Sequence, residues 1–266
     1  MSVLNALSDG FVVAKRNLIK IKRVPDLLVF TTLQPIMFVL LFAYVFGGAI
    51  EVKGSNYREF LVAGIFAQTV IFGAAITGTG LADDIQKGII DRFRSLPMSP
   101  SAVLFGRTLS DVVNNLIVMV VMSLTGLLVG WRIRTSVMEA LGGYLILLTF
   151  AYAFSWVMAM VGLLAPSPEV VNNASFVVIF PLTFVANTFV PISTLHGPWR
   201  TFAEWNPVSA VTEAARQLFG NIAPGTPPFD SWALRHPATY TLVWALAILI
   251  IFVPLTTRQF RRSVSR

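Results

Sequence analysis

Long stretches of apolar residues without charged side chains constrain this sequence most. Residues 27–47 read LLVFTTLQPIMFVLLFAYVFG, and residues 60–82 and 140–164 are equally free of Asp, Glu, Lys and Arg. A helix needs about 20 apolar residues to cross the hydrocarbon core of a bilayer. By that length the sequence predicts six membrane spans, at residues 27–47, 60–82, 103–129, 140–164, 170–190 and 239–257.

The composition also indicates a multi-pass membrane protein. Only 12% of the 266 residues are charged and 55% are hydrophobic, whereas about a quarter of the residues in a soluble domain are charged. We therefore expect an all-α fold with a single transmembrane domain over residues 1–266. The chain has no cysteine, which excludes disulfides and thiolate metal sites.

The net charge of +7 could suggest a nucleic-acid partner. The basic residues flank the apolar runs instead of forming one face, so they indicate membrane orientation and no nucleic-acid partner. Thirteen of the 20 Lys and Arg residues lie before the first span, between the second and third spans or in the first turns of the third, or after the sixth. The richer side is expected in the cytoplasm, which puts both termini there and the chain in the inner or plasma membrane. The first apolar run is too long for a cleaved signal and is expected to remain as an anchor.

Before the first span, apolar residues recur at helical spacing. A helix over residues 1–24 would gather them on one stripe, with most basic residues opposite. The stripe consists of Leu4, Leu7, Phe11, Ala14, Leu18 and Ile21. The helix either packs on the protein itself or lies on the inner leaflet, and the neighbouring basic cluster favours the second interpretation.

The segment 83–100, DDIQKGIIDRFRSLPMSP, concentrates charge between two spans. It predicts a short amphipathic helix over residues 84–98, which Pro97 would end. Its apolar arc would hold Ile89, Ile90, Phe93 and Leu96. Because a helix this short needs a docking surface, it is expected to bind the bilayer surface, the protein's own helices, or a groove on a soluble partner.

The longest loop, about residues 191–238, carries aromatic residues suited to a membrane–water interface, namely Trp199, Phe202 and Trp205. Residues 208–219 are predicted to form a short helix after Pro207. A loop of this length with a helical pattern is seldom without secondary structure, so residues 191–222 are expected to form re-entrant or interfacial helices.

Signatures of catalysis are missing from the sequence. None of the lysines follows a glycine, so there is no phosphate-binding loop of the G-x-x-x-x-G-K type. His196 and His236 lie in the long loop without a cluster of carboxylates, and a metal pair is not expected. There is also no G-x-S-x-G motif. We expect no catalytic site, cofactor or metal in this chain.

Charged residues inside the spans are rare. Asp111 lies in the third span, four residues after Arg107, and the spacing predicts a local ion pair between them. Glu139 and Glu169 lie at span ends. A proton- or sodium-coupled pump would be expected to bury an acid centrally. If the protein moves a solute uphill, the energy is therefore expected to come from elsewhere.

Uncharged polar residues do occur in the first, second and fifth spans, and Gln34, Gln68, Thr183 and Asn187 are among them. Most such groups bond across helices, and some are expected to line a route for an amphipathic substrate. Pro35 and Pro181 each fall inside a span and are expected to kink it.

Three motifs together resemble the membrane permeases of ABC-2 type transporters, most closely the daunorubicin-resistance permease group. They are QKGIIDRFRSLPMSPSAVLFGR at residues 86–107, LLAPSPE at residues 163–169 and FVPISTLHGPWRTFAEWNPVSAVTEAAR at residues 189–216. The resemblance extends, in order, over almost the whole chain.

The resemblance implies a six-span half-transporter of the type V exporter kind, which pairs with a second copy of itself or a paralogous permease. It also implies a separate cytoplasmic ATPase that binds ATP and Mg²⁺. In such permeases the segment matching residues 2–23 is a connecting helix near the ATPase. The segment matching residues 86–97 is the coupling helix that docks on the ATPase, and the region matching residues 191–221 caps the exit.

The family implies a solute route between the paired permeases along the first, second and fifth spans. We expect hydrophobic or amphipathic compounds such as drugs, polyketides or lipids to follow Gln34, Phe38, Gln68, Phe72, Thr183 and Asn187. The ATPase is expected to contact Gly88, Ile89, Arg92, Phe93, Arg94, Leu96 and Pro97. A stand-alone channel or secondary transporter is the alternative, and a lipid-modifying enzyme is a third class that would need a catalytic cluster.

Overall fold

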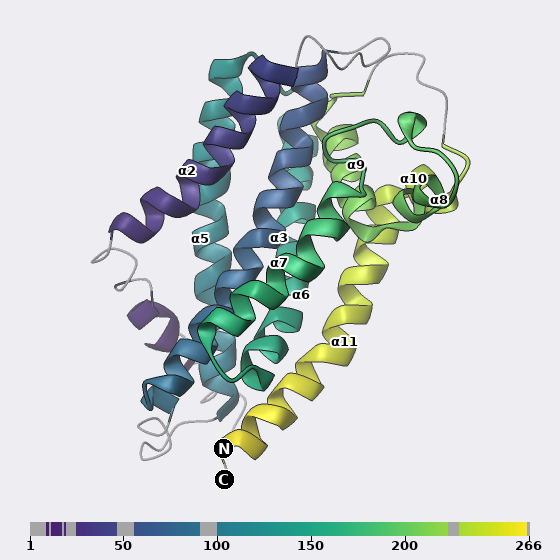
Figure 1. The fold of residues 1–266 in the computed structure, drawn as a ribbon. Coiled ribbons are helices and arrows are strands. Elements are labelled where there is room, and N and C mark those ends of the chain that lie inside the picture. The colour runs from purple at the N-terminus through teal and green to yellow at the C-terminus, as the bar shows by residue number, and fades with distance from the viewer. Residues whose placement is uncertain are drawn as a thin grey trace.

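The computed structural model describes residues 9–10, 12–17, 19, 25–46, 56–90, 100–222 and 229–264. Within these ranges every regular element is a helix (Figure 1). The described part of the chain therefore confirms the expected all-α architecture.

Four of the helices in the described part of the chain are long and apolar enough to cross a membrane. They are α3 (Tyr57–Gln86), α5 (Pro100–Val129), α6 (Val137–Leu164) and α11 (Pro237–Val264). At 1.5 Å per residue a 30-residue helix such as α3 is about 45 Å long, more than the roughly 30 Å of a bilayer core. The chain is accordingly a multi-pass membrane protein, and these helices contain four of the six predicted spans.

The other two predicted spans correspond to shorter helices. α2 (Pro25–Leu41) continues as the π-helical turn η1 (Phe42–Phe46), and α7 covers Pro168–Phe184. α7 ends at Phe184, before the predicted boundary at residue 190. There the Asn206 side chain donates hydrogen bonds to the carbonyls of Leu182 and Val185, at 2.8 and 2.9 Å. Carbonyls at a helix end need such partners. That α2 and α7 cross the membrane stays a prediction.

α3 lies at the centre of the bundle, and most of its residues are buried. It meets α6 at two glycines, since a Cβ atom on Gly162 would collide with the Gly78 carbonyl oxygen, and one on Gly78 would lie 2.6 Å from the Met158 carbonyl oxygen. Only residues without a side chain allow two helix backbones to approach this closely. α11 is far more exposed than α3, as expected for a helix at the edge of a membrane bundle.

The short helices gather at one end of the bundle (Figure 1). They are η2 (Ile192–Thr194), α8 (Pro198–Trp205), α9 (Pro207–Phe219) and α10 (Trp232–Arg235). α9 confirms the helix predicted after Pro207. Asn206 caps its start by accepting from the Val208 amide, and Gly220 ends it in the left-handed region with φ of 71°. We call this end of the bundle the α8–α10 end.

The opposite end, which we call the terminal end, contains the last turns of α11. There Phe260 belongs to an apolar cluster with Ile90 and with Leu104 of α5. The described residues 9–19 contact α5 near the same end. A Cβ atom on Gly10 would lie 2.6 Å from the Phe105 ring, and one on Gly106 would lie 2.5 Å from the Gly10 carbonyl oxygen. This contact supports the interpretation in which the N-terminal segment packs on the protein itself.

Candidate functional site

A cavity of about 480 Å³ opens between α2, α3, α5 and α7. Its walls are formed by Gln34, Pro35, Phe38, Gln68, Thr69, Phe72, Gly73, Ala75, Ile76, Thr79, Asn114, Asn115, Val118, Asn172, Ser175 and Phe176. None of these lining residues is ionisable. They combine amides and hydroxyls, which donate and accept hydrogen bonds, with phenylalanine rings that offer flat apolar surface.

Two contacts shape the cavity wall. The rings of Phe72 and Phe176 meet edge to face with centroids 5.7 Å apart. On α3, Gly73 leaves room for the Asn115 side chain of α5, because a Cβ atom at Gly73 would lie 2.5 Å from Asn115 Oδ1. The wall therefore holds an amide against a helix backbone, beside an aromatic pair.

Four of the six residues predicted for the substrate path line this cavity: Gln34, Phe38, Gln68 and Phe72. The other two do not. Thr183 is buried and donates to the Ile179 carbonyl of its own helix. The amide of Asn187 donates to Glu213 Oε2 at 2.8 Å, near the α8–α10 end.

Sequence reasoning missed the amides that α5 contributes to the cavity. Asn114 and Asn115 lie side by side in an apolar span, and both line the cavity. Adjacent amides in a span are costly unless they find partners or line a cavity. That pair of residues was the available signal.

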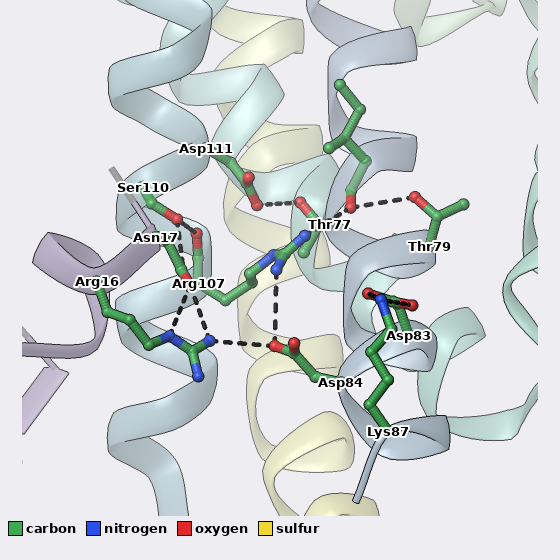
Figure 2. Close-up of polar contacts among 11 residues, drawn as sticks. Arg16, Asn17, Thr77, Thr79, Asp83, Asp84, Lys87, Arg107, Ser110 and Asp111 are labelled. Atoms are coloured by element: carbon green, nitrogen blue, oxygen red, sulfur yellow. Dashed lines mark hydrogen bonds and ion pairs between the residues drawn. The ribbon is translucent and has the colours of Figure 1, made fainter. Parts of the chain in front are cut away.

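Next to the cavity, a chain of polar contacts runs along α3 and α5 (Figure 2). Thr77 donates a hydrogen bond to the buried Asp111 carboxylate. Arg107 reaches across to α3, where Nη2 donates to the Ile76 carbonyl at 3.1 Å and Nη1 lies 3.7 Å from Asp84 Oδ2. The predicted ion pair between Arg107 and Asp111 is wrong, because α3 supplies closer partners for both side chains.

The N-terminal segment joins the same cluster. Arg16 Nη2 lies 3.2 Å from Asp84 Oδ2, the oxygen that also faces Arg107 (Figure 2). Its neighbour Asn17 donates to the Ser110 hydroxyl of α5 at 3.3 Å. Three segments far apart in the sequence therefore meet at the Asp84 carboxylate. We call Arg16, Asp84 and Arg107 the terminal-end cluster.

α3 ends just beyond this cluster. Lys87 caps the helix, and Gly88 follows with φ of 64°, a left-handed conformation that favours glycine. Lys87 Nζ lies 2.8 Å from the Asp83 carboxylate, and this hydrogen bond raises the pKa of Lys87. The first residues of the predicted 84–98 helix, 84–86, thus continue α3.

Of the residues predicted to contact an ATPase, Gly88 and the half-buried Ile89 are described. Ile90, from the predicted apolar arc, is buried against Leu104 and Phe260 of the protein itself. Arg92, Phe93, Arg94, Leu96 and Pro97 lie outside the described residues.

A second charged cluster lies near the α8–α10 end. Arg216 of α9 is buried, and its guanidinium lies 3.5 Å from the centre of the Phe60 ring. Arg216 donates to the Phe60 carbonyl at 3.0 Å and to the Thr188 carbonyl at 3.3 Å, and Nη1 lies 3.5 Å from Glu213 Oε2. These contacts join α9 to α3 and to the turn after α7.

Comparison with known proteins identifies the family. The ABC-2 type transporter family matches residues 10–219, which is most of the chain. The chain belongs to the ABC-2 type transporter family. The resemblance seen in its three motifs is thereby confirmed.

This ABC-2 protein is similar to several curated permeases. It is 34% identical to the daunorubicin resistance ABC transporter permease protein DrrB1 of Streptomyces coeruleorubidus, over 93% of this chain and 84% of that protein. It is 26% identical to the probable doxorubicin resistance ABC transporter permease protein DrrC of Mycobacterium tuberculosis, over 86% of this chain and 80% of that protein. It is 25% identical to the putative transport permease ycf38 of Cyanophora paradoxa, over 81% and 75%.

Proposed function

We propose that this ABC-2 protein is the membrane permease of an ATP-driven exporter, and that its cargo occupies the cavity between α2, α3, α5 and α7. The lining of that cavity carries the proposal. Several amides and three phenylalanine rings face a volume of about 480 Å³ beside the central helix. Ligand sites of this size are mostly apolar with a few polar groups that fix orientation.

The lining also suggests the class of cargo. None of the described residues that line the cavity is ionisable, so a charged group placed there would lose water without gaining a counter-ion from them. The cargo is therefore an amphipathic compound with aromatic surface and uncharged hydrogen-bonding groups. The names of the similar permeases refer to daunorubicin and doxorubicin resistance. These compounds match the expected aromatic surface and hydroxyl groups, and their basic amino group would enter this cavity in its neutral form.

The energy for transport comes from a separate ATPase in this proposal, which carries ATP and Mg²⁺. The sequence has no phosphate-binding loop of its own. The ATPase docks at residues 84–98, both termini face the cytoplasm, and a second copy or a paralogue completes the route. Residues 191–222 lie at the opposite side of the membrane.

Transport into proteoliposomes tests this function, with daunorubicin as the probe and the permease reconstituted with its ATPase. We expect accumulation that requires ATP, and neither transport nor ATP hydrolysis by the permease alone. Accumulation without nucleotide would support the rival channel or secondary transporter instead. ATP hydrolysis by the purified permease would contradict the assignment of hydrolysis to a separate subunit.

A pair of variants tests the cavity itself. Gln68→Leu removes a lining amide at nearly constant size and should weaken daunorubicin binding about tenfold, the equivalent of one hydrogen bond. Thr183→Val is the matched control, because Thr183 bonds its own helix and does not line the cavity. Equal affinities of the two variants, measured by equilibrium binding, would place the cargo elsewhere.

A further inference from the structure

Arg107 links the cavity wall to the terminal end of α3. Its guanidinium donates to the Ile76 carbonyl, and Ile76 lines the cavity. The same guanidinium faces Asp84, two turns further along α3 (Figure 2). One side chain of α5 thus spans from the turn that lines the cavity to the turn before Lys87 and Gly88.

The α3 surface has room for this side chain because of one glycine. A Cβ atom on Gly80 would overlap the Arg107 guanidinium, with Nη2 as the nearest atom. The hydroxyl of Thr79, another cavity-lining residue, also donates to the Ile76 carbonyl, at 3.2 Å. The turn of α3 from Ile76 to Gly80 therefore forms part of the cavity wall. The same turn is the surface against which the Arg107 guanidinium packs. A movement of this turn moves the contacts of Arg107.

The contacts of Arg107 are not those of a strong structural ion pair. Its distance to Asp84 is 3.7 Å, whereas charge-assisted hydrogen bonds are about 2.7–2.9 Å long. Its buried Nε has no hydrogen-bond partner among the described residues. Asp84 is shared with Arg16, so two cations face one carboxylate. Such a cluster has spare donors with which to exchange partners when a helix shifts.

We propose that Arg107 is a positioning residue that transmits displacement of the cavity wall to the end of α3 and, through Asp84, to Arg16 of the N-terminal segment. The part of this inference that concerns the ATPase rests on the proposed function, because residues 84–98 are its proposed docking site. The mechanical link itself needs neither ATP nor a known cargo.

The link can be tested in the full chain without cargo. The native chain has no cysteine, so Asn172→Cys in the cavity wall can be modified with a bulky maleimide that stands in for an occupant. Hydrogen–deuterium exchange of the protein in nanodiscs then reports local opening. We expect modification to change exchange at residues 12–17 and 84–90 by about fivefold or more, the lower range of allosteric coupling.

Variants show whether the Arg107 side chain transmits displacement of the cavity wall or only packs between α3 and α5. Arg107→Gln, and Gly80→Ala, which displaces the guanidinium without altering charge, should each abolish the response to modification. Lys87→Gln is the matched control, because it breaks the exposed pair with Asp83 near the same helix end and should leave the response intact. An unchanged response in Arg107→Gln, or no response in the parent, would overturn the proposal.

A second measurement connects the link to transport. In the complex with its ATPase, Arg107→Gln should keep basal ATP hydrolysis and daunorubicin affinity, and lose stimulation by daunorubicin. A double variant with Asp84→Asn should be no worse than the poorer single variant, because both act through one contact. Normal stimulation in Arg107→Gln would contradict the inference. A parent complex that does not respond to daunorubicin would instead count against the proposed function.

Discussion

Two glycines decide how closely the central helices pack. Gly78 of α3 and Gly162 of α6 bring the two backbones into contact, and a side chain on either would meet a carbonyl group of the other helix. Helix association in lipid depends on this kind of packing because the bilayer provides no hydrophobic force between helices. Gly142, in the same helix α6, differs: a Cβ atom there would lie 3.6 Å from Leu218, an ordinary contact.

This difference predicts opposite outcomes for two alanine substitutions in α6. Gly162→Ala should lower the free energy of unfolding by about 1–3 kcal/mol, since the backbone of α3 must shift. Gly142→Ala should be neutral or stabilising by up to about 1 kcal/mol, from helix propensity. Thermal unfolding in detergent measures both. Equal midpoints for the two variants would contradict the close crossing at Gly78.

Arg216 provides a second residue-scale prediction. Removing one partner of a buried ion pair leaves the other charge uncompensated, which costs about 3–5 kcal/mol. Arg216→Ala should therefore destabilise the chain by about that amount, measured by thermal unfolding. Arg200→Ala is the control, because Arg200 itself is exposed in its pairs with Glu204 and Asp230, and such pairs should contribute less than about 1 kcal/mol. A similar loss of stability in both variants would contradict a stabilising contribution from the buried contacts of Arg216.

At the scale of elements, the segment after α3 includes, near its start, a residue that packs inside the protein, and it continues through the proposed docking site. α3 ends at Gln86, and Gly88 adopts a left-handed backbone conformation. Ile90 then packs in an apolar cluster of the protein itself. Of the apolar arc predicted for this segment, Ile90 therefore packs on the protein's own core. Two other members of that arc, Phe93 and Leu96, lie outside the described residues.

Phe93→Ala and Ile90→Ala separate these two roles. Phe93→Ala should leave folding and membrane insertion intact and abolish cargo-stimulated ATP hydrolysis by the complex, because an apolar residue of the proposed docking site at residues 84–98 is lost. Ile90→Ala should lower the free energy of unfolding by about 2–5 kcal/mol, because a buried side chain is truncated. Stimulation and thermal unfolding are measured on the same preparations. Normal stimulation in Phe93→Ala would refute the docking role.

At the scale of the whole molecule, the terminal end and the α8–α10 end differ in character. The terminal end holds Arg16, Asp84 and Arg107 together with the last turn of α11, which carries Arg261 and Arg262. The α8–α10 end exposes aromatic residues, among them Trp199, Phe202, Trp205 and Trp232. Basic residues favour the cytoplasmic side, and exposed tryptophans favour a membrane–water interface.

This asymmetry predicts the orientation of the chain. In the cysteine-free background, Arg200→Cys should react with a membrane-impermeant maleimide on intact cells, and Lys87→Cys only after the cells are permeabilised. Both native side chains are exposed, so neither outcome depends on unfolding. Labelling of Lys87→Cys on intact cells would reverse the proposed topology.

The sequence by itself determined the four long apolar helices α3, α5, α6 and α11, since the length and apolar content of a span follow from the thickness of the bilayer. It also located the helix after Pro207, because proline suits the first position of a helix. It predicted four residues of the cavity, Gln34, Phe38, Gln68 and Phe72, but not Asn114 and Asn115.

Only the tertiary structure decided which helix faces reach one another. Local spacing joined Arg107 to Asp111, whereas packing on α3 offers Arg107 the Ile76 carbonyl and Asp84, over a glycine with no side chain in the way. Likewise, Thr183 and Asn187 resemble lining residues in the sequence but bond to their own helix and to Glu213. Periodicity specifies the faces of one helix; steric fit between distant segments selects the partners of those faces.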